Sequence, residues 1–199
     1  RSTQAKTLFP YTTLFRSTFS SGYTLDAILT RMDDSFQLML GRIETFAKPT
    51  VCALNGSAYG GGVDLASACD FRIGVHASRM FVPAAKFGLH YHPDGIRRFV
   101  QRVGPVAAKK VFMLGKTLHA DEMLRVGFLT DLVDQQNLDA TIDEYLASVL
   151  AGEASVMSSI KQNIDAFAHG DWDSAQWVDR YHATLQSDVI RQRLQKLGL

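Results

Sequence analysis

The chain has 199 residues, of which 46% are hydrophobic and 21% are charged, and its formal net charge is +1. This size and composition suit one domain with a sizeable core, and the nearly balanced charge gives no general case for binding nucleic acid or an anionic membrane. No apolar run reaches the roughly 18–20 residues that span a bilayer. The two cysteines, Cys52 and Cys69, lie in apolar segments without metal-ligand spacing, which is typical of reduced core residues in a cytoplasmic protein.

The first seventeen residues differ from the rest of the chain. Residues 1–17, RSTQAKTLFPYTTLFRS, show neither helical nor alternating periodicity. Their TLFPYTTLFRS portion back-translates to the oligonucleotide of a common sequencing adapter. We therefore interpret residues 1–17 as a non-native segment joined to a shortened reading frame and exclude them from the fold prediction. A genuine, irregular N-terminus is the alternative.

A serine-rich loop and a long helix come next. The loop, FSSGYTL, covers residues 19–25. Over residues 25–46, apolar side chains recur at three- and four-residue steps, which predicts one amphipathic helix with its stripe in the core. Lys48-Pro49 ends this helix, because the residue before a proline avoids helical backbone angles.

The stretch PTVCALNGSAYGGGVDLASACD, residues 49–70, organises the chain. Residues 50–54 predict a buried strand, and residues 63–68 predict a helix. Three consecutive glycines, 60–62, lie at this strand-to-helix transition, where they let the backbone approach a ligand closely.

The start of that helix suits a negative charge. Its first N–H groups have no intrahelical partners and lie at the positive end of the helix dipole, so they favour an anion or a developing oxyanion. Asp64 lies in the first turn. The alternative is a glycine-rich packing turn, with Asp64 only complementing the dipole.

Strands and helices continue to the C-terminus. We predict strands at residues 71–75, 80–82 and 128–133, and helices at residues 96–102, 105–114, 120–126, 138–150, 155–168 and 174–197. The local basic run, which we interpret as a solvated helix face or a contact for a phosphate-bearing ligand, comprises Arg97, Arg98, Arg102, Lys109 and Lys110.

The ordered motifs resemble the enoyl-CoA hydratase/isomerase family, the crotonase superfamily. NGSAYGGGVDLASACDFRIG is similar to the family's core signature, and the similarity continues through VGPVAAKKVFMLGKTLHADEMLRVGFLTDLV, residues 103–133. The resemblance implies an α/β fold, a crotonase-like (ClpP/crotonase) spiral of ββα units with a helical C-terminal region. By this resemblance, residues 18–134 are the core, incomplete at its N-terminus, and residues 135–199 are the helical region.

The resemblance also implies a site for an acyl-CoA thioester. It assigns the two oxyanion-hole N–H groups to Tyr23 and Gly61, and two such donors aimed at the thioester oxygen stabilise an enolate. The implied substrate-binding positions are Gly22, Ala58, Gly60, Gly62 and Ala84. No metal or redox cofactor is implied, since CoA is part of the substrate, and the complete protein is expected to be a homotrimer or a dimer of trimers.

The sequence departs from the family at the catalytic acids. Ala84 stands where hydratases carry their second catalytic glutamate, and Asp64 stands in place of the first. Replacement groups follow at His92 and Tyr91, so we predict Asp64 as acid/base with His92 or Tyr91 assisting. A polar surface loop whose imidazoles cap a helix is the alternative. His90-Xaa-His92 lacks a third ligand in its sequence context, so no metal site is predicted.

We therefore predict an enoyl-CoA hydratase/isomerase-family enzyme of the lyase or isomerase type. Ala84 keeps two alternatives open. One is another reaction of the family: double-bond isomerisation, thioester hydrolysis or decarboxylation. The other is a homologue that binds acyl-CoA without catalysis.

Overall fold

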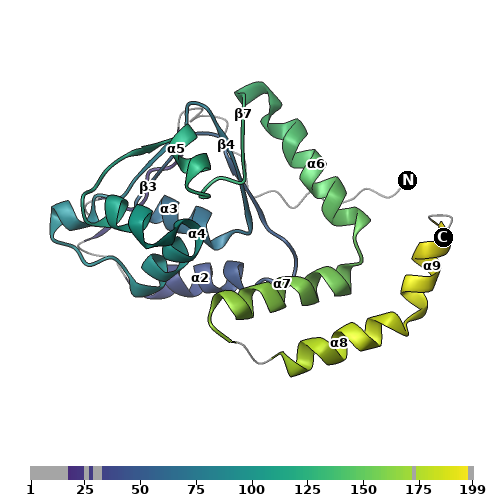
Figure 1. Ribbon diagram of the computed structural model, residues 1–199. Coiled ribbons are helices and arrows are strands. Elements are labelled where there is room, and N and C mark those ends of the chain that lie inside the picture. The colour runs from purple at the N-terminus through teal and green to yellow at the C-terminus, as the bar shows by residue number, and fades with distance from the viewer. Residues whose placement is uncertain (1–17, 25–26, 29–32, 172–173, 197–199) are drawn as a thin grey trace.

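The computed structural model describes residues 18–24, 27–28, 33–171 and 174–196, so the segment 1–17 that the sequence sets apart lies outside the described residues. Strands, singly or in consecutive pairs, alternate with helices, and the described chain ends in four helices (Figure 1). In chain order they are β1 (Thr18–Ser20), α2 (Ser35–Glu44), β2 (Val51–Leu54), β3 (Ser57–Tyr59), α3 (Gly61–Ala68), β4 (Phe71–Val75), β5 (Arg79–Phe81), η1 (Ala84–Phe87), α4 (Pro93–Phe112), β6 (Leu118–His119), α5 (Ala120–Arg125), β7 (Asp131–Val133), η2 (Gln135–Asn137), α6 (Leu138–Ala151), α7 (Ala154–Ala168), α8 (Ala175–Leu185) and α9 (Asp188–Lys196).

Two small sheets form the framework. One has the order β1-β3-β5-β6, with its first three strands parallel and β6 antiparallel, and the other is the parallel sheet β2-β4-β7. Side chains alternate between the two faces of a strand, so Cys52 and Leu54 of β2 both enter the core. The main core also contains Met80, Phe99 and Phe128, all essentially inaccessible. This arrangement is the α/β architecture predicted from the sequence.

The region of the predicted long helix shows one clear correction. The helix predicted over residues 25–46 is interrupted, because Asp33 lies outside helical structure and α2 begins only at Ser35. The Asp33 carboxylate accepts hydrogen bonds from the amide and hydroxyl of Ser35, at 2.9 and 2.5 Å, and such local bonds compete with the helix. Leu40 is fully buried as predicted, but Phe46 is 51% exposed, so the apolar stripe is only partly core.

Two other helical segments divide at specific residues. The two helices predicted on either side of residue 104 are present as halves of α4, which breaks at Gly104 with φ +74° immediately before Pro105. The first half begins earlier than predicted, at Pro93. The single helix predicted over residues 174–197 is wrong, because α8 and α9 are separate helices on either side of residues 186–187. The short strands β1, β3 and β6 were not predicted, and β1 includes the first residues of the predicted loop 19–25.

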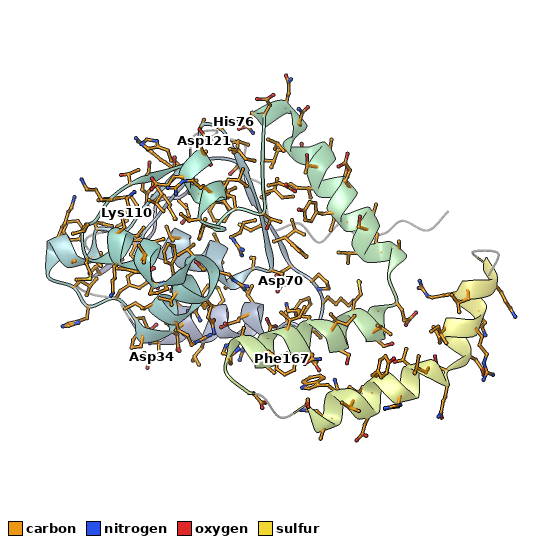
Figure 2. The ribbon with its side chains drawn as sticks, in the orientation of Figure 1. Asp34, Asp70, His76, Lys110, Asp121 and Phe167 are labelled. Carbon is orange, nitrogen blue, oxygen red and sulfur yellow. The ribbon has the colours of Figure 1, made fainter. Side chains whose placement is uncertain are left out.

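The C-terminal helices lie farther from the two sheets as the chain continues. Leu138 of α6 packs against Ile73 and Val75 of β4. Lys161 of α7 pairs with Asp70, which lies just before β4 and is labelled in Figure 2. Helices α8 and α9 extend away from the sheets (Figure 1). Among the described residues, no helix is both long and apolar enough to cross a membrane.

Candidate active site

The glycine-rich turn brings three segments into close contact. Gly60 has φ +49° and ψ −119°, a conformation that favours glycine, and its N–H donates to the carbonyl of Phe81 at 3.0 Å. A β-carbon on Gly62 would lie 2.6 Å from Cβ of Ser20. Only glycine at this position lets the end of β1 pack directly on the first turn of α3.

This packing forms a cavity at the start of α3. Its volume is about 270 Å³, and its lining is Ser20, Gly22, Tyr23, Phe36, Gly61 and Leu65. The two residues predicted as oxyanion donors, Tyr23 and Gly61, therefore line the same cavity, although they lie 38 positions apart in the sequence. The ring of Tyr23 packs edge-on against Phe36, with ring centroids 5.4 Å apart, which fixes one wall.

The backbone of this cavity offers N–H groups. Gly61 is the first residue of α3, so its N–H has no carbonyl one turn earlier to receive it. Among the described residues, none accepts a hydrogen bond from the N–H of Tyr23. The positive end of the α3 dipole opens on the same space, so the cavity can accept a carbonyl oxygen that gains negative charge.

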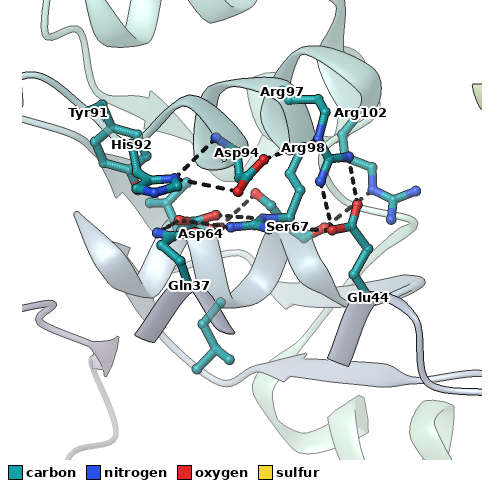
Figure 3. Close-up of polar contacts among 12 residues, drawn as sticks. Gln37, Glu44, Asp64, Ser67, Tyr91, His92, Asp94, Arg97, Arg98 and Arg102 are labelled. Atoms are coloured by element: carbon teal, nitrogen blue, oxygen red, sulfur yellow. Dashed lines mark hydrogen bonds and ion pairs between the residues drawn. The ribbon is translucent and has the colours of Figure 1, made fainter. Parts of the chain in front are cut away.

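Asp64 lies one turn further along α3 and is 2% exposed. Its Oδ1 accepts from Nε of Arg98 at 3.0 Å, and its Oδ2 accepts from Nε2 of Gln37 at 2.9 Å (Figure 3). Gly95 admits this carboxylate, because a β-carbon there would lie 2.7 Å from Oδ2. The predicted acid/base group is therefore held in a buried ion pair, and it is not among the residues that line the cavity.

The ion pair belongs to a larger network that includes Glu44 of α2. Arg97 binds Glu44 in a bidentate manner, with both N–O distances 2.9 Å, and Nη1 of Arg98 lies 3.4 Å from Oε2 of the same carboxylate (Figure 3). Burial alone would raise the pKa of Glu44, but the hydrogen bonds and charges of the two arginines outweigh it and lower the pKa. The same pairing raises the pKa of Arg97.

Tyr91 is the predicted assisting group that the structure brings closest to the glycine-rich turn. Its hydroxyl donates to the carbonyl of Gly60 at 3.1 Å, and its ring packs against Phe112 with centroids 4.8 Å apart. Burial, with a smaller contribution from the charge of Asp64, raises the pKa of Tyr91 well above its usual value. Tyr91 is therefore a neutral hydroxyl across the physiological pH range.

His92 contacts the backbone of its own helix. It is the N-cap residue of α4, where its Nδ1 accepts from the amide of Asp94 at 3.2 Å (Figure 3). This is the helix-capping role that the sequence left as the alternative. Of the remaining predicted positions, Ala58 in β3 and Ala84 in η1 are both buried in the core beneath the turn.

Arg98 is a buried charge whose place in the site was not predicted from the sequence. Arg98 is 2% exposed, so the basic run is not a uniformly solvated face. Helical spacing in the sequence could have indicated that Arg98 faces the protein interior. One helix face carries Gly95, Arg98, Phe99 and Arg102. Gln37 and Glu44 could not be found this way, since they reach the site from another helix.

The far end of α3 is also bound by arginines. Arg72 donates to the carbonyls of Phe128 and Cys69, the second at 2.6 Å, and Arg102 donates to those of Ser67 and Cys69 at 3.4 Å. Burial and the nearby charge of Arg102 lower the pKa of Arg72 to about 10. These cations complement the negative end of the α3 dipole. No group of three or more metal-ligating side chains gathers within the described ranges.

Sequence comparisons place these features among known proteins. The sequence matches the enoyl-CoA hydratase/isomerase family over residues 12–197, a range that begins inside the segment set apart above. The chain is 31% identical over 134 residues to the short-chain-enoyl-CoA hydratase of Clostridium acetobutylicum, covering 67% of this chain and 51% of that protein. It is 32% identical to the crotonyl-CoA hydratase of Syntrophomonas wolfei over 118 residues, covering 59% of this chain and 45% of that protein. The chain thus spans about half the length of the curated relatives it matches.

Solved structures show the same fold. An enoyl-CoA hydratase/carnithine racemase from Magnetospirillum magneticum superposes with a TM-score of 0.82 at 20% identity, covering 92% of this chain and 72% of that one. A putative family member from Hyphomonas neptunium gives a TM-score of 0.81 at 22% identity, covering 91% and 73%. The fold and the glycine-rich cavity define a crotonase-type α/β protein. More particularly, the chain belongs to the enoyl-CoA hydratase/isomerase family.

Proposed function

We propose that this protein binds an acyl-CoA thioester and stabilises the enolate formed from it, with the N–H groups of Tyr23 and Gly61 donating to the thioester oxygen. The observation that carries the proposal is that both residues line one cavity at the start of α3. The lining of this cavity is otherwise mainly apolar or aromatic, which suits an acyl group and excludes water from the developing charge. The names of the curated relatives, enoyl-CoA and crotonyl-CoA hydratases, agree with this substrate class.

The proposal assigns proton transfer to Asp64, assisted by His92 or Tyr91, in a reaction of the lyase or isomerase type. Asp64 lies within one turn of Gly61, and Tyr91 reaches the carbonyl of Gly60. To exchange a proton with substrate, Oδ2 of Asp64 must be released from Nε2 of Gln37 and from Nη2 of Arg98, while Oδ1 keeps its hydrogen bond with Nε of Arg98. His92 must use the nitrogen that does not cap α4.

Two thioesters test carbonyl binding and proton transfer separately. Acetoacetyl-CoA has an enolate that absorbs in the near ultraviolet, so an oxyanion hole raises that absorbance at neutral pH. Crotonyl-CoA loses its conjugated enoyl absorbance on hydration. We expect both signals from the wild-type protein. Asp64→Asn should abolish the second and keep only part of the first, because the asparagine oxygen can still accept from Nε of Arg98 but the ion pair is lost. A wild-type protein that leaves both spectra unchanged refutes the proposal.

The role of His92 can be separated from helix capping with a matched pair of variants. His92→Asn keeps a good N-cap but removes the imidazole, whereas His92→Ala removes both. If His92 assists catalysis, both variants lose hydration. If it only caps α4, His92→Asn retains turnover and His92→Ala loses stability by about 1 kcal/mol.

The residues at the two catalytic-acid positions, 64 and 84, favour decarboxylation as a second candidate reaction. Ala84 offers no carboxylate, and Asp64 is held by Arg98 and Gln37. Decarboxylation of a malonyl-type thioester needs no protein base, because the electron pair of the breaking C–C bond becomes the enolate as CO₂ leaves and water then protonates the α-carbon. Release of CO₂ and acetyl-CoA from malonyl-CoA, with crotonyl-CoA unchanged, would select this reaction.

We also propose that the C-terminal helices assemble copies of this chain into a homotrimer or a dimer of trimers. Large apolar side chains stand exposed on them, including Leu150 of α6, Ile164 of α7 and Tyr181 of α8. Such surface favours an interface. Size-exclusion chromatography with light scattering tests this, and a monomer at micromolar concentration would refute it.

A further inference from the structure

We infer that Arg98 is a positioning residue for the thioester site: it holds α3 through Asp64 and thereby fixes the Gly61 N–H relative to Tyr23. The inference rests on the proposed function and goes beyond it, because Arg98 acts without touching substrate. It also gives a role to one charge of the basic run, for which the sequence leaves open a solvated helix face or a contact for a phosphate-bearing ligand.

All three nitrogens of the Arg98 guanidinium are engaged. Nε donates to Oδ1 of Asp64 at 3.0 Å, Nη1 lies 3.4 Å from Oε2 of Glu44, and Nη2 bonds the side-chain oxygen of Gln37 and lies 3.5 Å from Oδ2 of Asp64 (Figure 3). The planar, fork-shaped guanidinium fixes the direction of each bond. Arg98 of α4 therefore ties α2 and α3 together at one buried point.

The backbone spacing between α3 and α4 depends on this pair. Gly95 lies one turn before Arg98, and a β-carbon there would come within 2.7 Å of Oδ2 of Asp64 and 2.6 Å of the Tyr91 ring. The carboxylate thus occupies the space between the two helices. If the pair is broken, Asp64 keeps a buried charge with only Gln37 as its neutral partner, and α3 must shift or admit water to solvate it.

The same helix holds the other end of α3. Arg102, one turn beyond Arg98, donates to the carbonyls of Ser67 and Cys69 at 3.4 Å. With this end bound, loss of the Asp64 contact removes the side-chain anchor of the first turn, where Gly61 lies, and leaves that turn held by the hydrogen bonds of Gly60 with Phe81 and Tyr91. Tyr23 belongs to a different segment, the loop after β1, so a shift of α3 changes the geometry of the two N–H groups. Misplacement by about 1 Å costs a reaction about 100-fold.

A purely structural ion pair makes a different prediction from a positioning role. A structural pair affects the fraction of folded protein, and so lowers the binding of every ligand alike. A positioning residue affects the enolate specifically. The discriminating quantity is the enolate absorbance of bound acetoacetyl-CoA, compared on the same sample with the affinity for CoA itself, which lacks the acyl carbonyl.

The experiment compares Arg98→Gln with Arg97→Gln. Arg97 is the neighbouring residue on α4 and also binds Glu44, but it makes no contact with Asp64, so it is a matched control. We expect Arg98→Gln to lower the enolate association constant about 100-fold while its affinity for CoA stays close to that of the wild type. In Arg97→Gln the enolate signal itself should stay close to that of the wild type. Arg98→Lys keeps the charge but cannot reach Asp64 and Glu44 together, so it should restore only part of the signal.

The outcomes separate the inference from the proposed function. A wild-type protein that gives no enolate signal refutes the proposed function, and the positioning role with it. A wild-type signal that persists in Arg98→Gln, or falls equally with CoA affinity or in Arg97→Gln, refutes the positioning role alone. Where Arg98→Gln does not fold, as judged by circular dichroism, Arg98→Lys decides, because a full wild-type enolate signal in it overturns the inference.

Discussion

Replacing Gly62 with alanine tests the packing on which the cavity depends. A β-carbon at Gly62 would lie 2.6 Å from Cβ, 2.8 Å from Oγ and 3.0 Å from the carbonyl oxygen of Ser20. Carbon atoms pack favourably at about 3.5–4.0 Å, and rotating the serine side chain cannot relieve the contacts with Cβ and the backbone. β1 must therefore move away from α3.

The expected cost follows from two opposing effects. Overpacking of this kind costs about 1–3 kcal/mol, and the better helix propensity of alanine returns up to about 1 kcal/mol. We expect Gly62→Ala to lower the free energy of unfolding by about 1–2 kcal/mol. Because β1 leads into the loop that carries Tyr23, the variant should also weaken the enolate signal with acetoacetyl-CoA.

Urea denaturation followed by circular dichroism measures the change, with Gly41→Ala as the control. Gly41 lies within α2, where an added β-carbon meets nothing within 4 Å, so alanine there should stabilise the protein by about 0.5–1 kcal/mol. The reasoning is refuted if Gly62→Ala is as stable as wild type, or if both substitutions change stability in the same direction.

Three further predictions concern buried polar groups. Lys161→Met should lower the free energy of unfolding by about 3 kcal/mol in urea denaturation, because it leaves the mostly buried carboxylate of Asp70 without the ammonium 2.7 Å away. A decrease of less than about 0.5 kcal/mol would mean that the pair is not buried in solution. Glu44 has a lowered pKa in the folded state, so its stabilising effect is present above its usual pKa and is lost as the pH falls through the pKa of the folded state. Glu44→Gln should remove this part of the loss of stability in acid, and an unchanged slope of stability against pH below 4.5 would contradict the prediction. Tyr91→Phe should lower the free energy of unfolding by about 1 kcal/mol, because it removes the hydrogen bond to Gly60. In a spectrophotometric titration the number of tyrosines that ionise near pH 10 should be the same as in the wild type, since the raised pKa keeps Tyr91 out of that range. One fewer ionising tyrosine would show that the phenol is accessible.

Local patterns in the sequence were sufficient for several elements of the fold. The apolar run before Asn55, the glycines 60–62 and the amphipathic period beyond Pro105 correspond to β2, the start of α3 and the second half of α4. Each depends on interactions within a few residues, which is the range that propensity and periodicity describe. Asp33 shows where such patterns fail, because its carboxylate accepts a hydrogen bond from the Ser35 amide that outweighs the helical period around it.

The candidate site likewise has one part that the local sequence predicts and another that depends on how the helices pack. The sequence by itself determined that α3 would begin at a glycine-rich turn with free N–H groups, since that follows from the order of Gly60, Gly61 and Asp64 in one segment. Only the tertiary structure decided what Asp64 contacts. Its partners, Gln37 and Arg98, come from two other helices, and their burial at one point depends on how those helices pack, which no local pattern encodes.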